Sequence, residues 1–236
     1  MSLNADLLRQ VHLSGESGCM KFQPHPMKAN FCTGCSKLFN KHSPNSIASD
    51  DMLIAAIEYS QKGQQEASCI LAGDSSIGGL YLGGFGAVVN QGFLKTNKIS
   101  HVLNTAGGLE IFGHKYPDAV ARAKSELGIT FLQLKWDDVT DFCIPEEDLV
   151  QAVRFIHHGR LEGGSILVHC AQGKSRSATA VVAYLMVTQN KPCAEALATV
   201  QSMRKMAEPN PKFLQTLRQF GGSPLIHSLR TELHCQ

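Results

Sequence analysis

Long apolar segments are missing from this sequence of 236 residues. No stretch approaches the roughly 20 consecutive apolar residues that a membrane-spanning helix needs. The first residues also lack the positively charged start and apolar block of a secretory signal. We therefore expect a protein of the cytoplasm, or of the cytoplasm and the nucleus, with no membrane span.

A strong excess of one charge is missing too. The formal net charge is +2 at pH 7, which is too close to neutral to indicate nucleic-acid binding from bulk charge. Apolar residues make up 43% of the chain and charged residues 18%, so the chain can bury a sizeable core and is expected to fold. The length suits one domain with a short extension, and the sequence contains no internal repeat.

Disulfide bonds are not expected, although the chain has eight cysteines. Proteins of the cytoplasm keep their thiols reduced, so each cysteine needs an explanation as a core residue, a metal ligand or a nucleophile. Two parts of the chain call for such an explanation. They are the N-terminal 64 residues and a loop that begins at residue 168.

The N-terminal extension, residues 1–64, is rich in Ser, Asn, Lys and His and shows little strand patterning. Cys32 and Cys35 form a C-x-x-C pair, and His25 and His42 lie on either side of it. These four side chains could hold a structural zinc ion with tetrahedral geometry. The alternative is a coincidental pair of thiols. A redox-active pair is less favoured because no strand–helix–strand pattern surrounds it.

Strands and helices alternate from residue 65 to residue 222. The expected strands are 69–71, 79–83, 100–104, 129–134 and 165–168, and the expected helices are 86–95, 116–127, 145–161, 176–189, 196–203 and 209–220. This alternation predicts an α/β fold with a central, mainly parallel sheet flanked by helices. We expect Ser49 to cap a short helix that docks on this domain, and we expect residues 223–236 to form a loose tail.

The segment 168–177 combines a cysteine, an arginine and the start of a helix. Cys170 follows an apolar strand and precedes a helix N-terminus, whose free N–H groups carry partial positive charge. Arg176 and His169 can add positive charge, and such surroundings lower the pKa of a cysteine. The backbone of the loop can direct its N–H groups at one phosphate, and Gly173 allows a close approach. The candidate phosphate-binding residues are Ala171, Gln172, Gly173, Lys174, Ser175 and Arg176.

Phosphate binding beside a thiolate indicates attack on phosphorus. The hydroxyls of Ser175 and Ser177 could donate to the thiolate when it leaves. The departing alcohol or phenol also needs a proton, and the acidic loop that follows the 129–134 strand offers Asp137, Asp138 and Asp141 as the acid.

Two other interpretations of the loop are weaker. Gly173-Lys174-Ser175 resembles the end of a nucleotide-binding loop, but that motif needs a glycine five residues before Gly173, where the sequence has Val168. A buried core thiol is the commonest fate of a lone cysteine. Glycine and arginine at these spacings from Cys170 argue against it.

His169-Cys170 through Arg176-Ser177 resembles the H-C-x-x-G-x-S-R-S signature of the dual-specificity protein phosphatases. The resemblance extends over about residues 68–221. It includes strands like those at 79–83 and 99–104, the helix segment 183–186 after the loop, and a C-terminal element with Arg204, Pro209-Asn210, Phe213, Gln215 and Leu217. A match distributed in this way is specific.

The resemblance implies hydrolysis of phosphate monoesters through a cysteinyl-phosphate intermediate, without a catalytic metal or other cofactor. Cys170 would be the nucleophile and Arg176 the phosphate clamp. Ser177 would aid release of the thiolate, and His169 would tune and position Cys170. The family's acid lies six residues before the apolar residue at Ile144, which gives Asp138.

The expected partners are proteins phosphorylated on tyrosine, serine or threonine, and the sequence does not set the oligomeric state. The N-terminal extension is too short for the kinase-docking domain of the larger members, so the chain resembles a small, atypical member. Lys174 departs from the usual Ile or Val of the family. It is either an exposed loop lysine or a residue that selects phosphoinositides or another non-protein phosphate. A phospho-binding scaffold remains a third alternative.

Overall fold

The structure is a computed structural model. It describes residues 22–25, 28–32, 49, 52, 65–107, 109, 114–139 and 141–234. The chain divides into two compact units, Met1–Lys62 and Gly63–Gln236.

The first unit contains a small antiparallel hairpin, which the sequence did not predict. Strand β1 (Pro24–His25) pairs with β2 (Lys28–Cys32), and Pro24 lies opposite Cys32. The Phe22 and Cys32 side chains are buried. Most of the helix predicted after Ser49 lies outside the described residues, but the Met52 N–H does donate to Ser49 Oγ over 3.3 Å.

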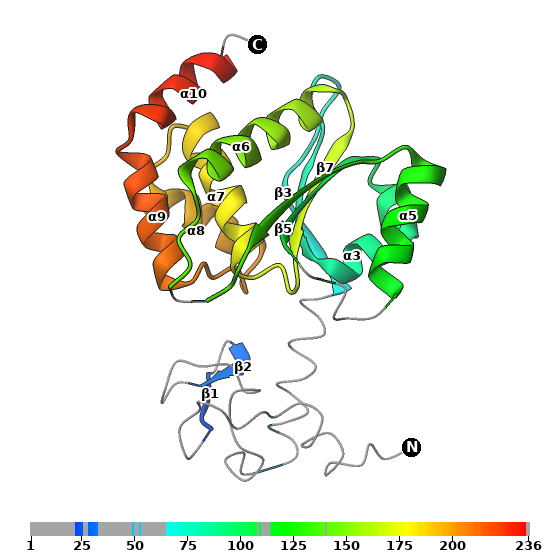
Figure 1. Ribbon diagram of the computed structural model, residues 1–236, viewed down its shortest axis with the longest axis horizontal. Coiled ribbons are helices and arrows are strands. Elements are labelled where there is room, and N and C mark those ends of the chain that lie inside the picture. Colours follow the sequence, from blue (N-terminus) through cyan, green and yellow to red (C-terminus); the bar gives the residue numbers. More distant parts are fainter. Residues whose placement is uncertain are drawn as a thin grey trace. The chain divides into compact units, whose positions relative to one another are not determined.

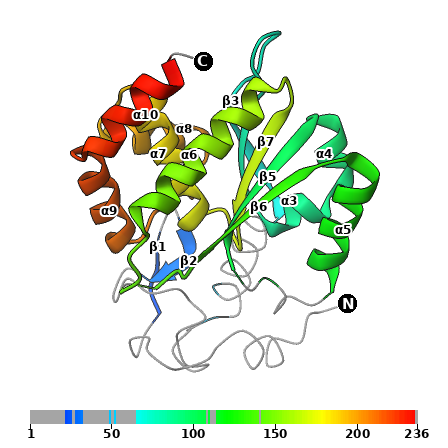
Figure 2. The same ribbon diagram turned by 45° about the horizontal axis from the view of Figure 1, so that its top comes forward.

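The second unit is built around a five-stranded sheet with the order β3-β4-β7-β5-β6 (Figures 1 and 2). Its strands are β3 (Ala67–Leu71), β4 (Leu80–Gly84), β5 (Ile99–Ala106), β6 (Thr130–Trp136) and β7 (Ser165–Cys170). Strands β4, β7, β5 and β6 are parallel, and only the edge strand β3 is antiparallel. The predicted α/β fold with a mainly parallel central sheet is therefore confirmed.

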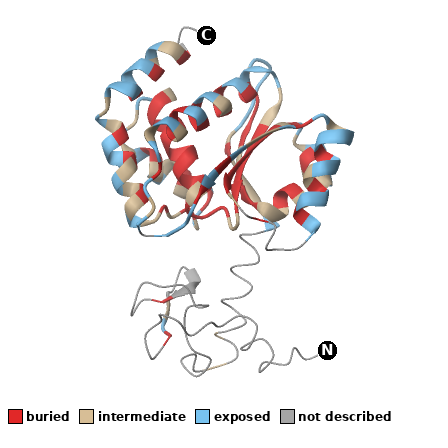
Figure 3. Cartoon of the chain, viewed as in Figure 1, coloured by how far each residue is buried: buried red, intermediate tan, exposed pale blue. Residues whose placement is uncertain are grey.

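Helices cover both faces of the sheet (Figure 1). On one side lie α3 (Phe85–Val89), α4 (Gln91–Thr96) and α5 (Lys115–Leu127), and on the other lie α6 (Glu146–Leu161), α7 (Arg176–Thr188), α8 (Cys193–Met203), α9 (Pro211–Gly221) and α10 (Pro224–His234). Helix α7 is buried on nearly every side, as its apolar sequence predicts (Figure 3). None of the helices in the described residues is long and apolar enough to cross a membrane.

The single helix predicted at 86–95 is wrong, because the structure has two short helices there. The chain breaks at Asn90, whose Oδ1 accepts a hydrogen bond from the Phe93 N–H over 3.0 Å. Asparagine competes with the backbone for hydrogen bonds, which makes it a better N-cap than a helix-interior residue.

The loose tail predicted for residues 223–236 is also wrong. Residues 224–234 form α10, and Ile226, Leu229 and Leu233 join the same core as α6, α7 and α9. Their spacing of three and four residues places them on one helical face. Arg154 of α6 donates two hydrogen bonds to the Glu232 carboxylate, over 2.8 and 2.7 Å.

Replacing Leu229 by alanine tests whether α10 belongs to the folded domain. Leu229 is 1% exposed, so Leu229→Ala should lower the free energy of unfolding by about 2–5 kcal/mol. Urea unfolding followed by circular dichroism measures this. Leu225, on the same helix but 39% exposed, is the control, and Leu225→Ala should change stability far less. Equal, small effects of both substitutions would contradict the observed packing.

Candidate active site

The loops that carry the predicted site residues come together at one edge of the sheet. Strands β7, β5 and β6 are parallel neighbours, so their carboxyl ends lie at the same edge. The loop 171–175 leaves β7 there, and the acidic loop 137–145 leaves β6 there. Ligands in parallel α/β folds bind at this edge, and the topology therefore places the candidate nucleophile and the candidate acid in one site.

Cys170 is the last residue of β7 and is only 2% exposed. Its Sγ accepts hydrogen bonds from the Gly173 N–H and from Ser177 Oγ, each over 3.2 Å. Helix α7 begins six residues later. It has no side-chain N-cap and no acidic residue in its first turn, so nothing from its own first turn competes for its N–H groups. The sulfur therefore lies among donors suited to a thiolate.

Some neighbours of Cys170 raise the pKa of its thiol and others lower it. Burial, the largest effect, raises it, because a charged sulfur is poorly solvated inside the protein. The positive charge of Arg176 and the hydrogen bonds from Ser177 lower it and together prevail, whereas the Asp138 carboxylate raises it slightly. The net result is a cysteine pKa below the ordinary value of 9.0, which favours the thiolate.

His169 supports Cys170 through the backbone and not through charge. It is fully buried, and burial, partly offset by a hydrogen bond to the backbone of Cys170, lowers its pKa to about 4. The ring is therefore neutral at pH 7. The expectation that His169 adds positive charge beside Cys170 is therefore wrong. Because a carbonyl oxygen can only accept, Nδ1 donates to the Cys170 oxygen over 3.3 Å, and Nε2 accepts from the Tyr116 hydroxyl over 3.1 Å.

Arg176 and Asp138 face each other across the site. Arg176 Nε lies 3.7 Å from Asp138 Oδ2, which is longer than a hydrogen bond, and another guanidinium nitrogen donates to the Trp136 carbonyl over 3.2 Å. Arg176 Nε is buried and makes no hydrogen bond with any residue that the structure describes. A buried donor of this kind can bind a phosphate oxygen.

Asp138 is held by residues from two distant segments. Its Oδ1 accepts from Ser175 Oγ over 2.7 Å and from Asn210 Nδ2 over 3.1 Å, which leaves Oδ2 on the side of Arg176. All three aspartates are exposed, but the hydrogen bonds from Ser175 and Asn210 and the approach to Arg176 involve Asp138, and no such contact of Asp137 or Asp141 is found among the described residues. The geometry thus favours Asp138 among the three candidates. Ser175 binds Asp138 instead of the thiolate, so only Ser177 makes the expected contact with sulfur.

Lys174 fits neither interpretation given to it from the sequence. It is 8% exposed, and its Nζ lies 3.0 Å from Glu208 Oε2. The Glu208 N–H also donates to the Lys174 carbonyl over 2.7 Å. The charge of Lys174 is therefore paired within the domain, and the residue is neither an exposed loop lysine nor an unpaired cation for a polyanionic substrate.

Arg204 holds the phosphate loop in place through its backbone carbonyls, a role that the sequence did not reveal. This buried side chain donates to the carbonyls of Gln172 and Gly173 over 2.9 and 2.8 Å. Gly173 has φ = +68°, and a Cβ there would lie 2.3 Å from the backbone of Gly83. Glycine is therefore required by backbone geometry and by close packing of the loop on β4.

Three supporting residues were missed as parts of the site: Tyr116, Arg204 and Asn210. Arg204 and Asn210 belong to the C-terminal element of the family resemblance, but nothing in their sequence spacing shows which atoms they bind. Tyr116 lies in a helix 54 positions before Cys170 and carries no local signal. Only the folded chain brings them to the site.

The predicted metal ligands are not assembled in the part of the chain that the structure describes. No group of three His, Cys, Asp or Glu side chains there could hold a metal ion. Cys35 and His42 lie outside the described residues. Zinc binding through Cys32, Cys35, His25 and His42 stays a prediction.

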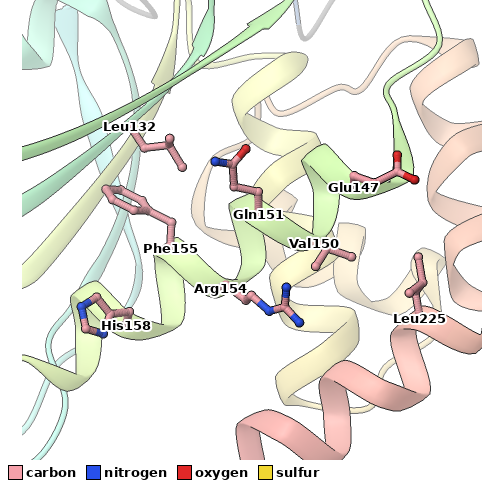
Figure 4. Close-up of a pocket in the computed structure, with 8 residues that line it drawn as sticks. All are labelled: Leu132, Glu147, Val150, Gln151, Arg154, Phe155, His158 and Leu225. Carbon is pink, nitrogen blue, oxygen red and sulfur yellow. The ribbon is translucent and has the colours of Figure 1, made fainter.

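A separate groove of about 620 Å³ lies between α6 and α10 (Figure 4). Leu132, Val150, Phe155 and Leu225 form its apolar part, and Arg154 and His158 contribute charge or polarity. No residue of the phosphate loop or the acidic loop lines it, so this groove is not the catalytic site.

Comparison with known proteins decides the family. The family model described as "Dual specificity phosphatase, catalytic domain" matches residues 80–223. The chain belongs to this family. The first strand of the match is β4, and the match ends just before α10. It thus spans the phosphate loop, the acidic loop and the Arg204 and Asn210 contacts.

Several members of the dual specificity phosphatase family are similar to this chain. Dual specificity protein phosphatase 15 of Mus musculus is 36% identical over 143 residues, which cover 61% of this chain and 55% of the relative. Dual specificity protein phosphatase 1 of Arabidopsis thaliana is 31% identical over 196 residues, 76% of this chain and 90% of the relative. The crystal structure of DUSP15 superposes with a TM-score of 0.56 at 30% identity, covering 69% of this chain and 95% of that one. The match spans only about half the length of the mouse relative.

Removing the Ser177 hydroxyl tests whether its hydrogen bond lowers the pKa of the Cys170 thiol. Ser177→Ala should shift the pH profile of Cys170 alkylation by iodoacetamide to higher pH, because a donor that favours the thiolate is lost. Near neutral pH the rate should fall roughly tenfold, since a hydrogen bond to a charged group contributes about 1.5–3 kcal/mol. Peptide mapping by mass spectrometry measures the rate at Cys170. Ser202→Ala, which changes an exposed serine of α8, is the matched control, and an unchanged profile in Ser177→Ala would refute the assignment.

Proposed function

We propose that this protein hydrolyses phosphate monoesters, and that it dephosphorylates phosphotyrosine and phosphoserine or phosphothreonine in proteins through a cysteinyl-phosphate intermediate. The observation that carries the proposal is the convergence of three groups at one sheet edge. These are the hydrogen-bonded Cys170 sulfur, the buried Arg176 Nε and the Asp138 carboxylate. Family membership supports the same chemistry.

In the first step, the Cys170 thiolate attacks phosphorus, and an S–P bond forms as the P–O bond to the leaving group breaks. Arg176 and the N–H groups at the start of α7 bind the phosphate oxygens, because both are donors aimed at the same place. Asp138 gives its proton to the leaving oxygen. Oδ2 is the oxygen suited to this task, because Oδ1 is occupied by Ser175 and Asn210.

In the second step, water attacks the phosphorus of the cysteinyl-phosphate. Asp138, now a carboxylate, accepts a proton from this water, and the P–S bond breaks. Inorganic phosphate and the Cys170 thiolate result. Ser177 Oγ lies 3.2 Å from the sulfur and stabilises the returning negative charge by donating a hydrogen bond. No step in this sequence requires a metal ion.

The two alternative functions have less support. The phosphoinositide alternative rested on Lys174, and the ion pair between Lys174 and Glu208 removes that motive. A phospho-binding scaffold would need no nucleophile, whereas Cys170 has two donors on its sulfur and a lowered pKa. Turnover, and not binding alone, is therefore the function that the geometry supports best.

The proposed place of action is the cytoplasm, or the cytoplasm and the nucleus. The support is chemical, since a reducing compartment keeps a catalytic thiol active. In the described part of the second unit, Cys69, Cys143, Cys170 and Cys193 are all free thiols.

Two substitutions test the mechanism. Cys170→Ser should abolish hydrolysis of an aryl phosphate and of phosphopeptides. Asp138→Asn should lower kcat roughly 100-fold for phosphoserine peptides, and less for aryl phosphates with a good leaving group, because the proton matters most for a poor one. Steady-state assays of phosphate release measure both. Asp137→Asn is the matched control and should retain most activity. Turnover that survives Cys170→Ser would refute the mechanism. A larger loss of kcat in Asp137→Asn than in Asp138→Asn would identify Asp137 as the general acid instead of Asp138.

We propose separately that the N-terminal unit holds a structural zinc ion on Cys32, Cys35, His25 and His42. The support is the C-x-x-C spacing and the β1–β2 pairing, which places the strand that carries His25 beside the strand that ends at Cys32. Metal analysis of the purified chain should find one zinc ion per chain, and Cys35→Ser should remove it whereas Cys143→Ser should not. A chain without zinc would overturn this proposal.

A further inference from the structure

A pocket of about 490 Å³ lies where α7 ends and α8 begins. Asn190, with φ = +50°, turns the chain there, and the end of α9 and one face of α10 close the other sides. Helix α7 has 13 residues and starts at the phosphate loop, so the pocket lies roughly 20 Å from Cys170. It is a separate cavity from the catalytic site.

Three cationic side chains line this pocket: Lys191, Arg218 and Arg230. None of the nine lining residues is acidic. Within the part of the chain that the structure describes, none of the three cations has a carboxylate within ion-pair distance. Lys174 and Arg154, by contrast, are each paired with a glutamate. The pocket therefore concentrates positive charge that the described residues do not neutralise.

Neighbouring groups add to this positive character. Helix α8 has 11 residues and begins at Cys193, which lines the pocket. No side chain caps its N-terminus, so no cap occupies the first N–H groups of the helix, which carry partial positive charge. The Cys193 thiol adds no negative charge, because burial raises its pKa even though Arg218 nearby lowers it. Negative groups among the described residues nearby are the carbonyl end of α7 and Glu195 in the first turn of α8, and Glu195 forms no ion pair with the three cations.

Capping of α7 accounts for part of this arrangement but not for all of it. Arg230 donates to the Met186 carbonyl over 3.0 Å, which satisfies one carbonyl in the last turn of α7. Lys191 Nζ donates to Thr199 Oγ1 over 3.1 Å. Arg230 Nε, however, is buried and makes no hydrogen bond with a described residue. Arg218 is exposed in the last turn of α9, where its charge favours the C-terminal end of that helix, and it makes no contact with the end of α7 among the described residues.

We propose that this pocket is a second anion site that binds a phosphate monoester group without hydrolysing it. Three cations suit a dianion better than a carboxylate, and arginine matches phosphate oxygens with paired donors. The phosphate could be carried by a phosphorylated protein segment or by a small phosphorylated metabolite, since both present the same group. The inference does not depend on the catalytic activity.

Residue-resolved NMR tests this inference, because the two phosphate sites report through different amides. The full chain with Cys170→Ser, labelled with ¹⁵N, is titrated with inorganic phosphate, glycerol 2-phosphate and a short phosphoserine peptide. The amides of Cys193 and Gly222 should shift and saturate, independently of the Gly173 amide in the phosphate loop. If the peptide binds more tightly than glycerol 2-phosphate, the natural ligand is a phosphorylated protein segment. If glycerol 2-phosphate binds as tightly as the peptide or more tightly, the natural ligand is a small phosphorylated metabolite.

Arg218→Gln and Lys191→Gln should each weaken binding at Cys193 and Gly222 roughly tenfold, since each removes a charge-assisted contact. Neither should alter the response at Gly173. Arg122→Gln, which removes an exposed arginine on α5, is the matched control and should leave both sites unchanged. The inference fails if sodium chloride produces the same shifts as phosphate, if Cys193 and Gly222 do not respond, or if the two variants bind as tightly as the control.

Discussion

The structure depends on stabilising negative charge inside the domain at the junction of β7 and α7. Burial alone would keep the Cys170 thiol protonated, because a charged sulfur is costly away from water. Arg176, Ser177 and the Gly173 N–H oppose this, and the start of α7 adds its uncapped N–H groups. These donors can act together only if the loop 171–175 holds one conformation. Much of the surrounding domain serves that purpose.

The loop is held from the side opposite the substrate. Arg204 takes up the carbonyls of Gln172 and Gly173, and the positive φ of Gly173 lets the loop lie against the backbone of β4. His169 fixes the Cys170 carbonyl through a neutral ring that Tyr116 orients. Because the carbonyls of these loop residues are hydrogen-bonded on that side, the backbone N–H groups of the loop can point toward a bound anion. Asp138, the candidate acid, is positioned in a similar way, since Ser175 and Asn210 both bind it and Ser175 couples the acidic loop to the phosphate loop.

Basic residues near the site and beyond it divide by whether a carboxylate accompanies them. Lys174 and Arg154 have glutamate partners, so the charge of each is neutralised locally, the first in a mostly buried pair and the second in an exposed one. Arg176 has only the long 3.7 Å approach to the Asp138 carboxylate, and it is the residue to which the proposed mechanism gives the phosphate. Lys191, Arg218 and Arg230 at the far end of α7 also lack a carboxylate partner among the described residues, and what sets them apart is that they line one pocket together.

Local sequence patterns alone were enough to predict the α/β class, most elements of the domain, the phosphate loop and the candidate nucleophile. These features depend on local periodicity and on a contiguous motif, which a linear pattern can show. The sequence placed Asp138 only through the family resemblance, because three aspartates share one loop. Tertiary structure decided the rest: the neutral His169, the pairing of Lys174 with Glu208, the contacts of Tyr116, Arg204 and Asn210, and the packing of α10. Each of these rests on contacts or burial among residues far apart in the chain, which folding alone brings within hydrogen-bonding distance.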